Sequence, residues 1–472
     1  MDKIKMSTSL SENMNYLNNY LAVSSNFDIV YRVIEIGGRE ACIYFIDGFC
    51  KDELMQKMLQ YFMDFKEEDM PADAHEMSKT RIPYVEVDMQ DQWDQITYFI
   101  MSGVFALFID GYDKCLLIDS RTYPARGVEE PEKDKVLRGS KDGFVETIVF
   151  NTALIRRRIR SQYLRMEMLH AGKSSQTDIV LCYMDNRVDH EFLNKIKERI
   201  NNIQVDALTM NQESLAECLY KKRWYNPFPK FKFTERPDTA AAQILEGDIV
   251  ILVDNSPSAM ITPTSIFDVI EEADDYYFPP ITGTYLRLSR FLIAILTYIM
   301  TPTFLLLMQR PEWIPAGFEF IAVKDTVNVP LIWQFLLLEL AIDGLRLAAV
   351  NTPNMLSTPL SVMAALVLGE FSVNSGWFNS EVMLYMAFVA IANYTQASYE
   401  LSYAIKFMRI INLILTAIFG MWGYIAGIIL TVLAIFTNRT VSGKSYVYPL
   451  FPLNLKQLSK RFFRYRLPGA RD

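Results

Sequence analysis

Three ionisable residues in the apolar C-terminal part of the chain have types and a spacing that membrane proteins use to handle ions. Glu339, Asp343 and Arg346 are four and then three residues apart, so at about 100° per residue they share one face of a helix. Ionisable groups at membrane depth are costly and generally face a water-filled path or each other. Two interpretations stay open: the three residues line an ion path, or they form a paired structural cluster in which Arg346 neutralises a carboxylate.

No catalytic or cofactor motif accompanies these residues. The sequence has no glycine-rich phosphate loop, nucleophile elbow, HExxH zinc motif or kinase signature. Its three histidines are far apart, and its five cysteines occur singly, without a C-x-x-C pair. Scattered cysteines are typical of reduced, buried thiols in a cytosolic compartment. We therefore expect no enzyme activity, no metal site and no cofactor.

Two short loops in the N-terminal part could bind a ligand, although each also has a structural interpretation. Asp47 and Gly48 end an apolar strand, and an Asp-Gly pair favours a tight turn because glycine accepts positive φ. A structural turn is therefore favoured there. Asp254 and Asn255 follow an apolar run at residues 248–253, a position where α/β proteins often bind ligands.

A cluster of arginines on an expected helix at residues 147–160 is a candidate subunit or partner interface. Its members are Arg156, Arg157, Arg158 and Arg160. Guanidinium groups pair well with carboxylates, so the cluster could bind an acidic partner or the acidic face of a neighbouring copy. The other interpretation is an ordinary solvated helix face.

Charge divides the 472-residue chain into two chemically different parts. The overall formal charge is −8, from 47 basic and 55 acidic residues. Residues 1–285 carry 32 basic and 46 acidic residues, a net charge of −14, whereas the remainder carries 15 and 9, a net charge of +6. The acidic part argues against a nucleic-acid partner. The first 19 residues lack the apolar core of a signal peptide, so we expect the acidic part to stay in the cytosol.

The second part contains the charge-free runs of a polytopic membrane domain. Runs of 19, 23, 18 and 29 residues occur at positions 291–309, 347–369, 382–399 and 410–438, and a shorter run begins at residue 327. About 20 apolar residues span the hydrocarbon core as a helix. Prolines interrupt two of the runs, so residues 353–373 are expected to be broken or re-entrant. Gly420, Gly423 and Gly427 either allow close helix packing or are incidental.

Basic residues at both ends of the membrane region indicate its orientation. Two arginines lie just before residue 291, and residues 439–471 contain eight basic residues. Both flanks are therefore expected in the cytosol, which requires an even number of crossings. Four spans plus the broken segment satisfy this condition but place Lys406 and Arg409 outside. If the broken segment is counted as a crossing, Lys406 and Arg409 lie inside and the basic tail lies outside. Five or six crossings are therefore alternatives to four.

The acidic part alternates strand and helix patterns, which predicts an α/β fold. Two pairs of apolar runs flank Gly37-Gly38 and Asp110-Gly111 and are typical of hairpins. Further strands are expected at residues 179–183, 203–208 and 248–253, between helices at residues 51–65, 147–160 and 191–200. A charged, Pro- and Gly-containing stretch at residues 124–143 separates two subdomains.

The predicted organisation thus has four parts. They are cytosolic α/β subdomains at residues 1–140 and 141–285, an α-helical membrane domain at 286–440, and a basic cytosolic tail at 441–472.

Several sequence motifs, in this order, resemble the A subunits of GerA-type spore germination receptors. They are FIDGF (45–49), ETIVFNTALIRRRIR (146–160), KSSQTD (173–178), FTERPD (233–238), GDIVILVDNSPSA (247–259) and DDYY (274–277). ELAIDGLRLAAVNTP (339–353), SYELSYAIKFMR (398–409) and SYVYPLFPLN (445–454) resemble the branch of stage V sporulation protein AF. The first of these replaces an LREAGIRLP-like stretch of the nutrient receptors, so the resemblance does not extend to direct nutrient sensing.

The resemblance implies an integral protein of the spore inner membrane or cell membrane in an endospore-forming bacterium. It also implies a homo-oligomer, with five copies as the expected number, that forms a channel for monovalent cations. A transporter-like B-type subunit or other spore membrane proteins would be partners, together with membrane lipid. The alternative is a non-conducting scaffold that docks other germination proteins through its acidic domain.

Overall fold

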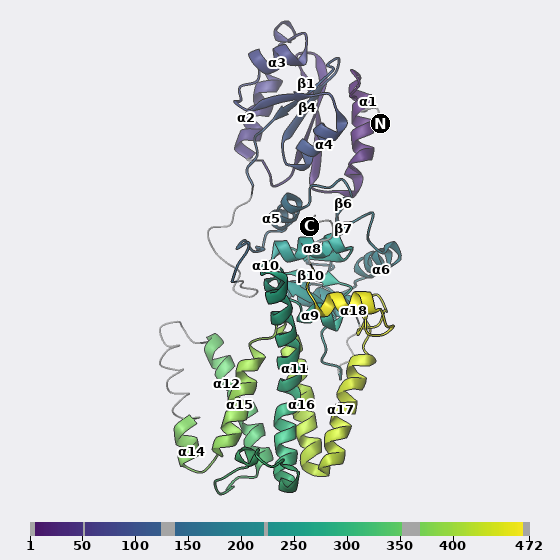
Figure 1. The fold of residues 1–472 in the computed structure, drawn as a ribbon. Helices are drawn as coiled ribbons and strands as arrows, with labels where there is room; N and C mark the ends of the chain where they lie inside the picture. The colour runs from purple at the N-terminus through teal and green to yellow at the C-terminus, as the bar shows by residue number, and fades with distance from the viewer. Residues whose placement is uncertain (1–4, 51, 124–136, 221–224, 352–368, 466–472) are drawn as a thin grey trace. The chain divides into compact units, whose positions relative to one another are not determined.

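The computed structural model of the protein describes residues 5–50, 52–123, 137–220, 225–351 and 369–465 (Figure 1). The chain divides into two compact units, one of residues 1–221 with 231–263 and one of residues 222–230 with 264–472. We call them the sheet unit and the helix unit. The helix unit begins ahead of residue 286, because α9 (Ile266–Ile270) and α10 (Asp274–Tyr277) join the base of α11 (Pro280–Gln309).

The first half of the sheet unit is a five-stranded antiparallel sheet of order β1-β2-β4-β5-β3. Its strands are β1 (Ile29–Ile36), β2 (Arg39–Ile46), β3 (Val87–Gln90), β4 (Phe105–Ile109) and β5 (Cys115–Ile118). Every residue of β4 and β5 is buried, which explains their unbroken apolar sequences.

Helices cover both faces of this first sheet. Alternate strand residues point to opposite faces, so Phe108 joins a core with α1 (Leu10–Tyr20) and α4 (Trp93–Met101), whereas Leu107 joins a core with α2 (Asp52–Met63) and α3 (Ala74–Thr80). This half is therefore a three-layer sandwich with two hydrophobic cores.

The second half of the sheet unit repeats the architecture with order β6-β7-β9-β10-β8, again antiparallel. Its strands are β6 (Leu164–Ala171), β7 (Thr177–Met184), β8 (Lys232–Thr234), β9 (Ile249–Val253) and β10 (Ala259–Thr262). α5 (Ile148–Arg158) and α8 (Pro237–Glu246) share one core with the sheet. α6 (His190–Asn201) contacts β6, and α7 (Asn211–Leu219) contacts β9. The predicted two-subdomain α/β region is confirmed.

Five apolar helices form most of the helix unit in the part of the chain that the structure describes. They are α11, α12 (Leu331–Asn351), α15 (Ser380–Asn393), α16 (Tyr399–Phe419) and α17 (Met421–Phe436), with the short α14 (Ser372–Asn374) and α18 (Leu455–Phe462) beside them. Of these, α11 and α16 are long and apolar enough to cross a membrane by themselves. Large apolar side chains are exposed on the helices, including Leu292, Ile295, Trp333, Leu340, Leu384, Ile391, Ile418, Trp422 and Leu433. Such a surface suits lipid better than water.

Buried ion pairs join α11 to the short helices before it. Arg290 places its Nη2 atom 2.7 Å from Asp275 Oδ1, and Arg287 places its Nη2 atom 2.8 Å from Glu271 Oε1. Asp275 is 0% exposed. The two arginines that were expected to mark the cytosolic side of the first span are thus neutralised by buried partners.

The long apolar run at residues 410–438 is two helices rather than one span. α16 ends at Phe419, Gly420 adopts a φ of +58°, and α17 begins at Met421. Gly423 and Gly427 then meet α16 closely: a Cβ atom would lie 1.8 Å from the Leu415 backbone oxygen at Gly423 and 2.2 Å from Asn412 Oδ1 at Gly427. The close-packing interpretation of these two glycines is therefore confirmed.

Other predicted elements differ in detail from the structure. Residues 203–208 form a loop rather than a strand. The strands β3, β6, β8 and β10 were missed, because their polar or short sequences resemble loops. The predicted break at Pro353 and Pro359 lies outside the described residues.

The contact at Gly423 yields a stability prediction. Gly423→Ala forces α16 and α17 apart, because the added Cβ would overlap backbone that has no rotamer to change. We expect a lower melting temperature of the purified protein in detergent, corresponding to about 1–3 kcal/mol of overpacking. Gly344→Ala is the matched control, since a Cβ there meets nothing within 4 Å on α12. Equal melting temperatures for the two variants would contradict the packing described.

Candidate functional site

A buried carboxylate on α12 is paired with an arginine on α16 inside the helix unit. Glu339 is 4% exposed and Arg409 is 0% exposed. Arg409 donates from Nε and Nη2 to Glu339 Oε1 over 2.9 and 2.6 Å. A buried charge is tolerated only when an opposite charge and hydrogen bonds replace its water. This pair therefore ties α12 to α16.

A second cation on α16 extends the cluster to Asp343. Lys406 lies 3.4 Å from Glu339 Oε2, donates to the Glu339 backbone oxygen over 3.2 Å, and forms an ion pair with Asp343. The Asp343 side chain is 31% exposed, compared with 5% for Glu339. The two carboxylates and two cations sum to zero formal charge.

Arg346 has different neighbours from those expected. Its guanidinium group lies over the rings of Tyr394 and Tyr403, at 5.0 and 5.5 Å from their centroids. Aromatic faces attract cations. Among the described residues, Glu339 and Asp343 form their ion pairs with Lys406 and Arg409 of α16. Arg346 is therefore not the residue that neutralises these carboxylates, because Lys406 and Arg409 lie closer.

Lys406 and Arg409 are the site residues that sequence reasoning missed. In the sequence, both look like loop charges that mark one side of the membrane, whereas in the structure both are buried within α16. Their signal was a helical period: Lys406, Arg409, Asn412 and Thr416 recur every three or four residues on one face. Asn412 and Thr416 are also 0% exposed.

Polar groups continue from the charge cluster along α11, α16 and α17. Arg409 donates from Nη1 to the backbone oxygen of Thr297 over 3.1 Å, and Asn412 donates to the Tyr298 hydroxyl over 3.3 Å. That hydroxyl lies 2.8 Å from Thr431 Oγ1. Thr301, which is 0% exposed, has no hydrogen-bond partner for its hydroxyl among the described residues. A row of buried polar groups, joined by the half-buried Tyr298, thus lies between apolar helices, where hydrocarbon cannot satisfy them.

In the sheet unit, Arg156 joins the two subdomains and is not exposed. It is 0% exposed and donates from Nε and Nη2 to the two oxygens of Asp28 over 2.7 and 2.8 Å. It also donates to Asn26 Oδ1 over 3.3 Å, an atom that accepts from the Met166 amide over 2.9 Å. Arg156 is therefore not available to an interface, because it is buried and its charge is neutralised by Asp28.

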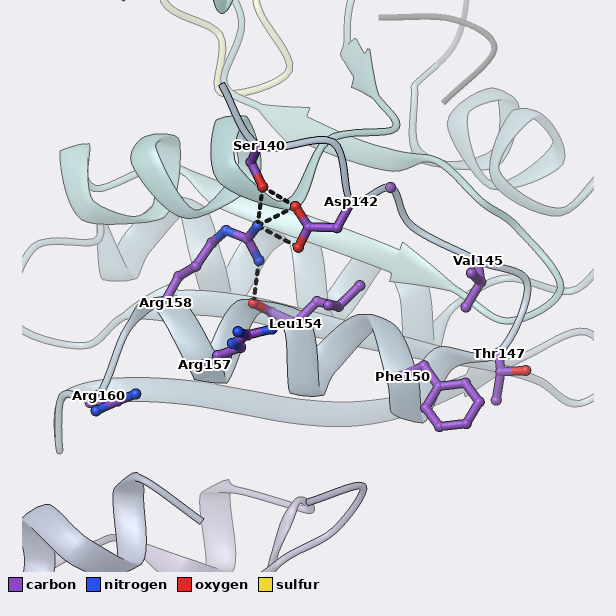
Figure 2. Close-up of a pocket in the computed structure, with 10 residues that line it drawn as sticks. Ser140, Asp142, Val145, Thr147, Phe150, Leu154, Arg157, Arg158 and Arg160 are labelled. Carbon is purple, nitrogen blue, oxygen red and sulfur yellow. Dashed lines mark hydrogen bonds and ion pairs between the residues drawn. The ribbon is translucent and has the colours of Figure 1, made fainter. Parts of the chain in front are cut away.

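The other three arginines of the cluster, Arg157 and Arg158 at the end of α5 and Arg160 just after it, line a cavity of about 640 Å³ with Ser140, Asp142 and Thr147 (Figure 2). Figure 2 shows Arg158 turned toward Ser140 and Asp142, and its Nη2 atom lies 2.6 Å from Asp142 Oδ2. Although burial alone raises the pKa of Asp142, hydrogen bonds from Arg158 and Ser140 hold this pKa below its ordinary value. Arg157 lies over the Tyr123 ring and Arg160 is exposed.

Both candidate ligand loops make structural contacts with α5. Gly48 has a φ of +79° and donates its amide to Asp47 Oδ1 over 2.9 Å, and a Cβ at Gly48 would lie 3.1 Å from Val149. Asp254 accepts from the first amide of α5, and the Asn255 amide donates to the Glu146 oxygen over 2.8 Å. These contacts fit the structural interpretation of both loops.

All five cysteines lie in the sheet unit and form no disulfide there. Burial raises the pKa of the Cys42 thiol to about 12. Among the described residues, no group of three or more His, Cys, Asp or Glu side chains is arranged to hold a metal ion.

Comparison with known proteins gives matches along almost the whole chain. The family model described as Bacillus/Clostridium GerA spore germination protein matches residues 15–472. Stage V sporulation protein AF of Bacillus subtilis (strain 168) is 35% identical over 472 residues, covering 100% of this chain and 95% of the relative. Spore germination protein KA of the same strain is 27% identical over 94% of this chain and 82% of the relative.

A solved structure also resembles part of the chain. It is the N-terminal domain of the A subunit of the Bacillus megaterium spore germinant receptor GerK3, at 26% identity and a TM-score of 0.43. The match covers 56% of this chain and 98% of that one.

The Arg156–Asp28 pair yields a prediction for the sheet unit. Arg156→Met leaves the Asp28 carboxylate buried without its counter-charge, so we expect a loss of about 3–5 kcal/mol in the free energy of unfolding. Denaturant unfolding of the purified protein, followed by circular dichroism, measures this loss. Arg160→Met is the matched control, because this exposed arginine should change the free energy by less than about 0.5 kcal/mol. Similar losses in both variants would show that the buried pair does not hold the subdomains together.

Proposed function

Since the chain belongs to the GerA family of spore germination proteins, we propose that it is a membrane subunit that oligomerises into an ion channel. The chain is a membrane-associated protein of this family, with two helices able to span a bilayer. In the proposal, the channel conducts monovalent cations during germination or amplifies their release.

The observation that carries the proposal is the row of buried polar groups inside the apolar helix unit. A conducting protein must offer polar groups along a route through helices that otherwise face lipid. Glu339 and Arg409 begin such a row, and Asn412, Tyr298 and Thr431 continue it between α11, α16 and α17. A purely structural bundle could use apolar side chains at these positions at lower energetic cost.

Within this row, Asp343 is the carboxylate best placed to meet an ion. Its side chain is 31% exposed, whereas that of Glu339 is 5% exposed and holds Arg409. In the proposed path, Asp343 attracts the cation, Glu339 keeps the neighbouring helix in position, and Arg346 contributes a positive charge beside Tyr394 and Tyr403.

The second candidate function is a non-conducting scaffold, and one observation favours it. The cluster of Glu339, Asp343, Lys406 and Arg409 is electrically neutral, and its inner members are already paired. A neutral, satisfied cluster can serve packing alone. In that case the helix unit would only anchor the acidic sheet unit, which would dock other germination proteins.

The proposed assembly is a ring of identical subunits, with five as the expected number, beside a transporter-like B-type subunit. Arg157 and Arg160 are the exposed members of the arginine cluster, and they could meet acidic residues of a neighbouring sheet unit around the ring. Arg158 contributes less, because it is paired with Asp142.

The proposed location is the spore inner membrane, with the sheet unit in the cytosol. Contacts within the helix unit support an arrangement in which both ends of the membrane region lie on the same side of the membrane. Arg287, near the start of α11, donates to the backbone oxygen of Lys460. Gln309, at the far end of α11, donates to the backbone oxygen of Thr416, beside the α16–α17 turn. The chain therefore leaves α17 at the end where α11 begins. Lys406 and Arg409 are buried, so they do not count as loop charges in the positive-inside rule.

The channel proposal is tested by neutralising its carboxylates. We expect Asp343→Asn, and more strongly Glu339→Gln with Asp343→Asn, to reduce cation flux severalfold in vesicles that contain the protein with its partners. The matched control, Glu312→Gln with Glu319→Gln, removes the same charge from exposed positions between α11 and α12 and should leave the flux unchanged.

A second double variant separates conduction from folding. Glu339→Leu with Arg409→Leu replaces the buried pair by apolar side chains, which preserves or raises stability in many proteins. If this variant melts like the parent protein and conducts normally, the pair lies outside the path. If neither the parent protein nor its complex passes ions, the scaffold function is correct.

A further inference from the structure

The segment that follows α17 exposes an unusual number of large apolar side chains. Within residues 450–465 the exposed fractions are 71% for Leu455, 64% for Phe451 and 63% for Leu453, and Leu450, Phe463 and Tyr465 are also exposed. So many exposed large apolar side chains in one short segment call for a partner. The same segment exposes two lysines, Lys456 and Lys460.

Helix α18 packs against the part of α11 where its apolar sequence begins. The ring of Phe462 lies 5.1 Å from the ring of Phe291 and 5.9 Å from that of Phe267. Phe291 is the first residue of the 19-residue charge-free run of α11. α18 therefore lies where a spanning α11 would cross from the headgroup layer into hydrocarbon.

Hydrogen bonds at its C-terminus fix the orientation of α18. Arg287 donates from Nη1 to the backbone oxygens of Lys460 and Arg461 over 2.9 and 3.3 Å, which satisfies carbonyl groups that a helix end leaves open. Arg461 in turn lies 2.6 Å from Asp268 Oδ1 and 3.0 Å from Glu271 Oε2. In Figure 1, α18 lies across the direction of α11 and α17. This is the orientation of a helix in the membrane plane.

The residue order of α18 suits a membrane surface. At about 100° per residue, Lys456 and Lys460 share one face of α18, and Leu455, Leu458 and Phe462 share another. On that second face Phe462 packs against Phe291 and Leu458 is half-buried, whereas Leu455 is exposed. A short helix with lysines opposite an apolar face is typical of segments that lie in the interface of a bilayer. Lysines near an anionic leaflet are attracted to its headgroups.

We propose that residues 450–465 form an interfacial anchor that inserts its apolar side chains into one leaflet and binds anionic lipid headgroups through Lys456 and Lys460. The occupant of the exposed apolar surface is thus the membrane itself. Arg287 and Phe291 of α11 contact α18 directly. The binding of anionic lipid by α18 is therefore linked mechanically to the first membrane-spanning helix.

The anchor is tested in the full-length protein reconstituted into vesicles. A fluorophore is attached at Leu453→Cys in a background where the half-buried Cys50 and Cys218 are serine. We expect lipids with a shallow nitroxide to quench this label about twofold or more strongly than a label at Val85→Cys, an exposed apolar residue of the sheet unit. Leu453 is an exposed position, so this substitution should not affect folding.

Lipid charge provides the second arm of the experiment. In vesicles of phosphatidylcholine with phosphatidylglycerol, Lys456→Gln with Lys460→Gln should reduce the quenching at residue 453. In phosphatidylcholine alone, these lysine substitutions should have no effect. Quenching by a water-soluble reagent instead of by lipid would overturn the proposal. Protection from both quenchers would overturn it too, because protein would then cover the segment.

Discussion

Buried arginine–carboxylate pairs form the contacts between elements on which the rest of this structure depends. Taking a charge out of water is expensive, so each buried guanidinium group must find an acid at the correct distance. One pair joins the two subdomains of the sheet unit, one joins α10 to α11, and one joins α12 to α16; they are Arg156–Asp28, Arg290–Asp275 and Arg409–Glu339. Removing either partner leaves a charge that the interior cannot solvate. These pairs therefore specify which elements meet, whatever they contribute to net stability.

The same requirement shapes the helix unit and its proposed function. Glu339 is enclosed by Arg409 and Lys406, while Asp343 remains partly open. A charge held rigidly by two partners is suited to positioning helices, whereas a partly exposed one can exchange its partner for a passing ion. The proposed path and the structural cluster are thus two uses of a single arrangement, and they differ in whether Asp343 meets water.

Local patterns predicted the elements better than the partners of the charged residues. The hairpins around Gly37-Gly38 and Asp110-Gly111 were visible because turn residues separate apolar runs, and both are present. The grouping of Glu339, Asp343 and Arg346 on one helix face was also readable. The partners of these residues could not be predicted in this way. Lys406 lies 63 residues from Asp343 in the sequence, and no local pattern indicates that the two side chains meet. Likewise, Arg156 and Arg157 are adjacent in sequence, but one is buried and the other exposed.

By itself, the sequence determined the division into an acidic α/β part and an apolar helical part, and its motifs identified the family. These properties depend on composition and on periods of two or three to four residues, which are local. Only the tertiary structure decided which charges are neutralised, that residues 410–438 turn back at Gly420, and that α18 lies against the base of α11. Each of these outcomes depends on contacts between residues far apart in the chain, where the energy of burying a charge or an apolar surface is set by whatever the fold places beside it.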